Sequence, residues 1–129
     1  MTAIREIMRT DVLEVEMAAT LQEAAQAMRE RKISSLAVTE KDRLVGIMTE
    51  RDIVTAVADG ADSEVAHVRD YMTNSPVSAG AGTSVEEASQ IMLEHGFRHL
   101  PVVDDDQRLI GIVSLRDLMR AGVKVPTRE

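Results

Sequence analysis

The chain has 129 residues, of which 44% are hydrophobic, and its formal net charge is −7. This length suits one domain with its own core, and the acidic balance without a Lys/Arg-rich run argues against nucleic-acid binding. The absence of cysteine excludes disulfide frameworks, zinc-thiolate clusters and thiol nucleophiles. Neither a signal-peptide pattern nor a long apolar run occurs, so we expect a cytoplasmic protein that does not enter a membrane.

The first half of the chain combines strand and helix patterns. Residues 12–16 alternate as a short strand, and Thr20 with Glu23 forms a capping-box pattern that opens a helix ending near residue 32. Residues 33–39 and 44–48 are typical of two strands around a polar turn, after which a helix runs from residue 49 to about 58. The predicted unit is therefore βαββα.

The second half of the chain repeats the first. Residues 43–56 and 108–121 are identical at seven of fourteen positions. Residues 21–28 align with residues 85–92 at an offset of 64, whereas residues 43–56 align with residues 108–121 at an offset of 65. The second repeat therefore has one additional residue between its two aligned segments. Such a repeat indicates two copies of one structural unit within a single fold.

The second copy follows the same plan. A strand is expected at Val77, and Ser84 with Glu87 forms a cap pattern that opens a helix ending at residue 95. Strands are expected over residues 97–103 and 109–113, and a final helix runs from residue 114 to about 121.

The repeats also set the expected boundaries. Two short amphipathic segments, residues 4–8 and 68–72, align with each other, and we expect each to pack beneath the opposite repeat. The predicted parts are a first repeat over residues 1–60, a linker over 61–66, a second repeat over 67–125 and a frayed tail over 126–129.

The closing motif of each repeat carries a family resemblance. Both copies contain Gly-Ile-x-[Thr/Ser]-x-Arg-Asp, and the second is preceded by FRHLPVVD over residues 97–104. This doubled order resembles a pair of CBS domains, named for cystathionine β-synthase, over nearly the whole chain. The resemblance implies an α/β (α+β) fold in which two βαββα repeats pack with pseudo-twofold symmetry into one module. It also implies clefts that bind adenosine derivatives such as AMP, ADP, ATP or S-adenosylmethionine.

Two polar quartets are the strongest candidate site residues. Thr49 and Asp52, like Ser114 and Asp117, begin a helix that follows a strand, where free backbone N–H groups favour an anion. An ionised Asp can also accept hydrogen bonds from a ribose diol. The resemblance implies that ribose role for both aspartates, and a ribose or phosphate contact for Thr49 and Ser114. Helix capping without any ligand explains the same quartets, so both interpretations stay open.

A basic pair distinguishes the two copies. Arg98 and His99 begin a strand of the second repeat, whereas the aligned positions of the first repeat hold Ser34 and Ser35. In the resembled family such a pair commonly faces phosphate oxygens, where Arg supplies a planar fork and His a pH-dependent donor. A surface Arg beside a strand-packing His is the alternative interpretation.

The resemblance further implies two composite sites, each drawing residues from both repeats. One site is expected to contain Asp117, Ser114, Arg116, Arg98, His99, Val12, Ile33 and Ser34. The other is expected to contain Asp52, Thr49, Arg51, Pro76, Val77 and Phe97. The second site should bind phosphate less tightly, because its own strand offers serines.

The resulting functional hypothesis is a non-catalytic regulatory module that senses an adenine nucleotide and signals its occupancy to a protein partner. No nucleophile with its base is recognisable, so we expect neither an enzyme nor a cofactor. A small hydrolase or transferase that acts on a nucleotide is the remaining alternative. The acidic run over residues 104–106 is interpreted as a solvated turn and not a metal site.

Assembly and ligand leave alternatives open. The second helices expose apolar side chains, so we expect a homodimer. These side chains are Ile53, Val54, Val57, Leu118 and Met119. A module that binds no nucleotide and serves dimerisation or protein interaction, or one that binds S-adenosylmethionine, is the alternative.

Overall fold

The computed structural model describes residues 2–123 and divides the chain into two compact units. Residues 12–76 form the early unit, and residues 2–11 together with 77–123 form the late unit. Residues 124–129, and with them the predicted tail, lie outside the described part of the chain.

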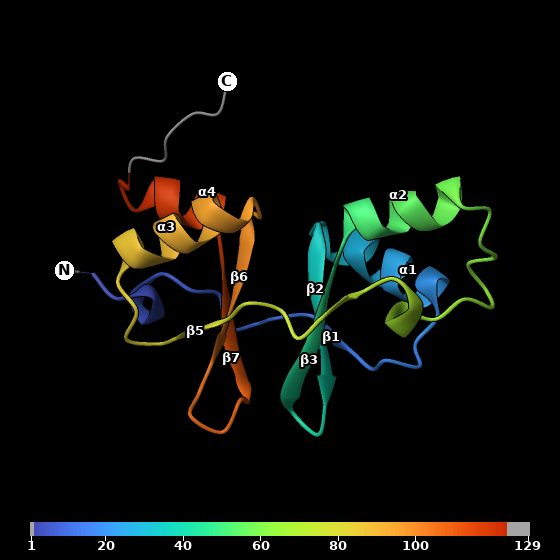
Figure 1. The fold of residues 1–129 in the computed structure, drawn as a ribbon, viewed down its shortest axis with the longest axis horizontal. Helices are drawn as coiled ribbons and strands as arrows, with labels where there is room; N and C mark the ends of the chain where they lie inside the picture. The colour runs from blue at the N-terminus through green and yellow to red at the C-terminus, as the bar shows by residue number, and fades with distance from the viewer. Residues whose placement is uncertain (1, 124–129) are drawn as a thin grey trace. The chain divides into compact units, whose positions relative to one another are not determined.

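The early unit consists of a mixed sheet with helices on one face (Figure 1). Its strands lie in the order β1-β2-β3-β4, with β1 parallel to β2 and the other neighbours antiparallel. The elements are β1 (Glu14–Val15), α1 (Leu21–Arg31), β2 (Ser35–Glu40), β3 (Arg43–Thr49), α2 (Glu50–Ala58), the 3-10 turn η2 (Val68–Asp70) and β4 (Thr73–Asn74).

The late unit has the same plan with one strand fewer. Its strands lie in the order β5-β6-β7, with β5 parallel to β6 and β6 antiparallel to β7. The elements are the 3-10 turn η1 (Ile4–Glu6), β5 (Ala79–Gly80), α3 (Val85–His95), β6 (His99–Val103), β7 (Leu109–Ser114) and α4 (Leu115–Arg120). In Figure 1, α3 and α4 cover one face of this sheet.

These elements confirm the mixed α/β class, and the principal helices and strands follow the predicted order. The strand expected at Val77 instead covers Ala79–Gly80, and Val77 itself is exposed. Strand β4 was not predicted, because a two-residue strand next to a turn leaves no alternating pattern to detect.

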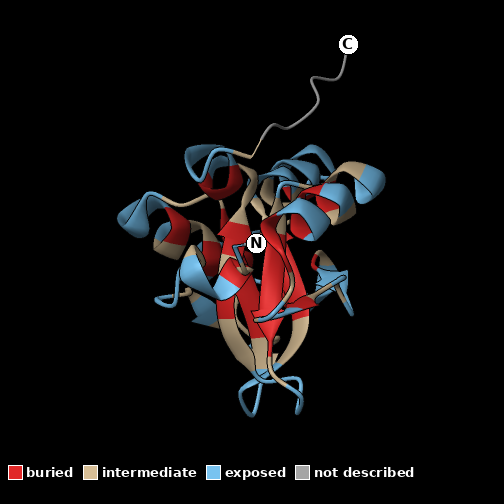
Figure 2. Cartoon of the chain, turned by 90° about the vertical axis from the view of Figure 1, so that its left-hand side faces the viewer, coloured by how far each residue is buried: buried red, intermediate tan, exposed pale blue. Residues whose placement is uncertain are grey.

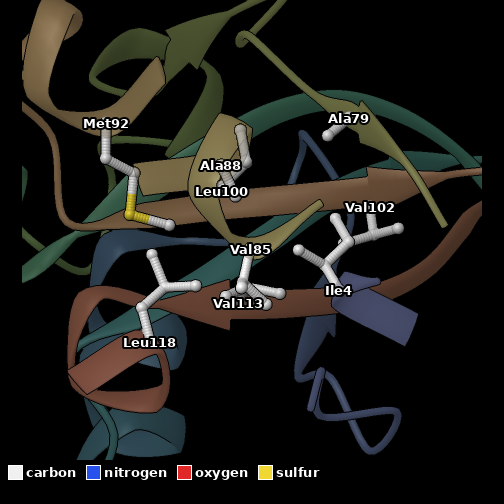
Figure 3. Close-up of a cluster of buried hydrophobic side chains, with 9 residues drawn as sticks. All are labelled: Ile4, Ala79, Val85, Ala88, Met92, Leu100, Val102, Val113 and Leu118. Atoms are coloured by element: carbon white, nitrogen blue, oxygen red, sulfur yellow. The ribbon is translucent and has the colours of Figure 1, made fainter. Parts of the chain in front are cut away.

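The leading segment of each repeat packs in the unit formed by the other repeat, as predicted. Ile4 is fully buried in the late unit, where Figure 3 shows it among side chains of β6, β7 and α3. Val68 is likewise fully buried in the early unit, within a cluster that includes Leu36 and Met48. Burial of a side chain of this size stabilises a fold by about 1.5–3 kcal/mol. The compact units therefore do not coincide with the sequence repeats.

Burial follows the same pattern in both units. Figure 2 shows the buried residues concentrated along the strands and on the inner sides of the helices, while the hairpin tips are exposed. Aliphatic side chains and methionines fill both cores, in agreement with a composition that contains one Phe and no Trp. Among residues 2–123, no helix has both the length and the hydropathy needed to cross a bilayer.

Helix α1 begins at a reciprocal cap. The Thr20 backbone N–H donates to Glu23 Oε1 at 3.1 Å, and the Glu23 N–H donates to Thr20 Oγ1 at 3.1 Å. The hydrogen bond from the Thr20 backbone lowers the pKa of Glu23 below its ordinary value, and the hydrogen bond from the Thr20 hydroxyl adds a smaller lowering. This cap therefore stabilises the fold above the ordinary carboxyl pKa, and the contribution is lost as the pH falls through the lowered value.

Two glycines permit the leading segments to approach the sheets. A Cβ on Gly111 of β7 would lie 2.9 Å from the Arg9 backbone oxygen and 2.6 Å from Met8 Sδ. The equivalent Cβ on Gly46 of β3 would lie 3.1 Å from the Thr73 backbone oxygen. Both positions therefore require a residue without a side chain.

We expect Gly111→Ala to destabilise the protein by about 1–3 kcal/mol, because the new methyl group collides with backbone that cannot rotate away. Thermal or urea unfolding measures the loss. Gly80→Ala is the matched control, since no atom lies within 4 Å of its added Cβ, and it should change stability by less than about 0.5 kcal/mol. Equal effects of the two substitutions would contradict the close approach of the Arg9 backbone.

Candidate functional site

Asp117 lies in the first turn of α4 and is the best-defined candidate in the late unit. Its side chain is only 9% exposed. The Ser114 backbone N–H donates to Asp117 Oδ2 at 2.9 Å, and the Asp117 N–H donates to Ser114 Oγ at 3.0 Å. The predicted cap is thus formed, and it occupies one of the two carboxylate oxygens.

The basic pair lies directly beside this cap. His99 is paired with Ser114 across β6 and β7, and the Leu115 N–H donates to the Arg98 backbone oxygen at 2.8 Å. Arg98 is exposed and His99 is half-buried. The late unit therefore brings together Arg98, His99, Ser114 and Asp117, which the sequence separates by up to 19 residues.

The early unit repeats this arrangement with neutral partners. The Thr49 N–H donates to Asp52 Oδ2 at 2.8 Å, and the Glu50 N–H donates to the Ser34 backbone oxygen at 3.0 Å. Ser35 is paired with Thr49, as His99 is with Ser114. Asp52 is half-buried and therefore more accessible than Asp117.

The remaining candidates fall into two groups. Arg51 and Arg116 are exposed beside the two aspartates, on α2 and α4. The apolar candidates lie in the segments that precede the strands or connect the units: Val12, Ile33 and Pro76 in the early unit, Val77 and Phe97 in the late unit. Of these, Phe97 contacts the ring of His95, with ring centroids 5.3 Å apart.

Sequence reasoning did not single out Arg9, although it lies at the late site. Its Nε atom is 3.7 Å from Asp117 Oδ1. The alignment of the two leading segments contained a usable signal, because the offset of 64 that aligns the first helices of the repeats places Arg9 opposite Thr73. Because each leading segment packs in the unit formed by the other repeat, Arg9 lies in the late unit and Thr73 lies in the early unit.

The acidic run behaves as a turn. Asp104 Oδ1 accepts hydrogen bonds from the backbone N–H groups of Asp106 and Arg108, each at 2.9 Å. Gln107 completes the turn with a φ of 65°. Within the part of the chain that the structure describes, no group of three or more His, Cys, Asp or Glu side chains could hold a metal ion.

A groove separates α1 from α2 in the early unit and has a volume of about 370 Å³. Buried Leu21 and Ala56 and half-buried Ile53 line it together with exposed Val57, whose side chain is 69% exposed. The expected exposure of Leu118 is wrong, because its side chain is fully buried in the core of the late unit. An exposed apolar side chain at the edge of such a groove is a typical contact for another protein.

Comparison with protein families gives two matches along the chain. The family model for the CBS domain matches residues 4–59 and 68–124. An uncharacterized 17.7 kDa protein of Acidianus ambivalens is 43% identical over 130 residues, and the match spans 99% of this chain and 77% of that protein. The CBS domain-containing protein YhcV of Bacillus subtilis is 38% identical over 119 residues, which span 92% of this chain and 84% of that protein.

Solved structures give the same result and carry ligands. Hypoxic Response Protein I, solved with two coordinated zinc ions, matches with a TM-score of 0.83 and 36% identity over 92% of this chain and 98% of that one. The CBS domain pair of MJ0100, in complex with 5′-methylthioadenosine and S-adenosyl-L-methionine, has a TM-score of 0.87 and 26% identity over 94% and 95%. PAE2072 of Pyrobaculum aerophilum, complexed with AMP, has a TM-score of 0.84 and 25% identity over 90% and 89%.

The two caps should differ in their contribution to stability. Ser114→Ala removes the acceptor of the Asp117 N–H and should cost about 1 kcal/mol in the free energy of unfolding. Thr49→Ala should cost less, because the structure gives its hydroxyl a long contact of 3.5 Å to Asp52 Oδ2 and no bond from the Asp52 N–H. Thermal unfolding of both variants tests this, and a larger loss for Thr49→Ala would contradict it.

Proposed function

Because this chain belongs to the CBS domain family, we propose that it is a non-catalytic regulatory module that binds an adenosine-containing ligand and passes its occupancy to a protein partner. The observation that carries the proposal is the repeated Thr/Ser-x-x-Asp turn, built on the same strand-to-helix connection in both units. Its relatives of the same fold support it, since one was solved with AMP and another with 5′-methylthioadenosine and S-adenosyl-L-methionine.

We further propose roles for the predicted site residues. Asp117 and Asp52 would each accept hydrogen bonds from ribose hydroxyls with a carboxylate oxygen, for which an ionised Asp offers several lone pairs. Val12, Ile33, Ser34, Pro76, Val77 and Phe97 would contact the base. Ser114 and Thr49 would contact ribose or phosphate, with Arg116 and Arg51 at the edge of each site.

The charge difference between the units favours a phosphorylated ligand in the Asp117 site. Arg98 is exposed beside the Asp117 cap, and His99 adds a second donor when protonated. Ser34 and Ser35 occupy the same places in the early unit and bring no charge. AMP, ADP or ATP is therefore the proposed ligand of the Asp117 site, and S-adenosylmethionine, which lacks phosphate, is the alternative.

A second candidate function is dimerisation or protein interaction without a nucleotide. The groove between α1 and α2 and the exposed Val54 and Val57 favour this possibility. The two functions are compatible, because the proposed ligand contacts and these helical surfaces involve different residues. We propose a homodimer, with the cytoplasm as its compartment.

Binding calorimetry with AMP, ATP and S-adenosylmethionine tests the ligand directly, and mass spectrometry of small molecules released from the purified protein identifies one that copurifies. Micromolar affinity for AMP or ATP would support the nucleotide proposal. Binding of S-adenosylmethionine alone would favour the alternative ligand, and binding of none would leave the interaction module as the better function.

Asp117→Asn should weaken AMP binding at least tenfold, because a charged acceptor of the ribose hydroxyls becomes an amide. The unliganded protein should lose less than about 1 kcal/mol, since the amide oxygen can still accept the Ser114 N–H. Asp52→Asn is the matched variant and should cost less affinity if its site is the weaker one. Thermal shift with and without AMP measures both quantities. An Asp117→Asn protein that melts earlier but keeps its full ligand-induced shift would contradict the ribose role.

Val57→Glu should convert a dimer to a single chain, because it places a charge on the apolar edge of the groove. Sedimentation at micromolar concentration measures the mass. Val65→Glu is the control, since Val65 is equally exposed at 67% but lies outside both helices, and it should sediment as the unaltered protein does. A single-chain mass for the unaltered protein would rule the dimer out.

A further inference from the structure

Arg9 approaches the candidate site of the late unit from a segment outside the repeated motif. Its Nε atom lies 3.7 Å from Asp117 Oδ1. The Arg9 side chain is 51% exposed, whereas that of Asp117 is 9% exposed. The guanidinium group of Arg9, which is always charged, therefore lies partly exposed beside a nearly buried carboxylate.

Backbone pairing, and not the side chain alone, holds Arg9 at this place. The Arg9 N–H donates to the Ile112 oxygen at 2.9 Å, and the Ile112 N–H donates to the Arg9 oxygen at 3.0 Å. Ile112 precedes Ser114 by two residues on β7, and Gly111 permits the close approach. Buried Ile4 anchors the same segment in the core. The backbone of Arg9 is therefore held at a defined position relative to the Ser114–Asp117 cap.

The two oxygens of Asp117 have different partners. Oδ2 accepts the Ser114 N–H at 2.9 Å, and Oδ1 is the oxygen nearest Arg9. A separation of 3.7 Å is too long for a strong hydrogen bond but short enough for electrostatic attraction. Oδ1 is therefore attracted to Arg9, and its lone pairs can still accept a hydrogen bond from a hydroxyl group.

The early unit has the same geometry without the charge. Thr73 is paired with Ile47 of β3, as Arg9 is with Ile112 of β7, and its side chain is neutral. Within the described residues, Asp52 forms no ion pair of 4.0 Å or less. Of these two aspartates, Asp117 has a guanidinium partner within the described residues and Asp52 has none.

We propose that Arg9 is a positioning residue of the late site, which orients Oδ1 of Asp117 toward the ribose diol of the ligand. The inference rests on the proposed ribose role of Asp117 and adds a residue to that site. It also gives a second reason, besides Arg98 and His99, for the late site to bind more tightly than the early one.

The test compares AMP with 2′,3′-dideoxyadenosine 5′-monophosphate, which carries the same base and phosphate but no diol. Arg9→Gln should lower the affinity for AMP about five- to tenfold, less than the loss of a direct charge-assisted contact because Arg9 acts through Asp117, and should change the affinity for the dideoxy ligand less than about twofold. Arg9→Lys should restore part of the AMP affinity, because it keeps the charge.

Arg98→Gln is the matched control, because a residue that contacts phosphate should weaken both ligands by the same factor. A second measurement needs no ligand. Arg9→Gln should lower the melting temperature of the otherwise unaltered protein, and should have no further effect in the Asp117→Asn background, since its partner charge is gone.

Each outcome decides the matter. Equal losses of AMP and dideoxy ligand on Arg9→Gln would overturn the positioning role, since Arg9 would then act on the phosphate or on the fold. Additive melting losses in the ligand-free cycle would overturn the contact itself. Failure of the unaltered protein to bind either nucleotide would instead overturn the proposed function, and the ribose role of Arg9 with it.

Discussion

The structure depends on the pairing of each leading segment with the sheet of the opposite repeat. Each sheet and its two helices leave an apolar face that its own repeat does not cover, and Ile4 or Val68 fills it with no exposure to solvent. The pairing is possible because Gly111 and Gly46 admit a neighbouring backbone. Two hydrogen bonds between Arg9 and Ile112 then align the segment with β7.

The two candidate sites differ in their charged residues, and one of these, Arg9, comes from an exchanged leading segment. Both quartets form the same turn from strand to helix, and in both an aspartate accepts a backbone N–H three residues earlier. What differs is the residues at equivalent backbone positions: Arg98, His99 and Arg9 in the late unit, and Ser34, Ser35 and Thr73 in the early unit. The two halves thus keep one backbone design while their charged side chains have diverged.

Local patterns predicted the helices and strands well because caps and apolar periodicity act within a few residues. Thr20, Ser84 and Ser114 each accept the N–H that the cap pattern predicted. The ion pair of Arg9 with Asp117 joins residues 108 positions apart, and no local pattern encodes such a contact. Strand β4 has the same explanation, since it exists only through its pairing with β3. The capping role of Asp117 was predictable, whereas its cationic neighbour required the fold.

The exchanged segments have a consequence for how such a chain could arise. A single βαββα repeat would lack the apolar side chain that completes its core, since Ile4 and Val68 each come from the leading segment of the other repeat. Two identical repeats could complete each other by mutual exchange, as in a domain-swapped pair. Joining them in one polypeptide preserves that reciprocity and removes its dependence on concentration. Once joined, the two copies were no longer required to be identical, and an arginine could replace a threonine beside one carboxylate while the other kept its neutral neighbour.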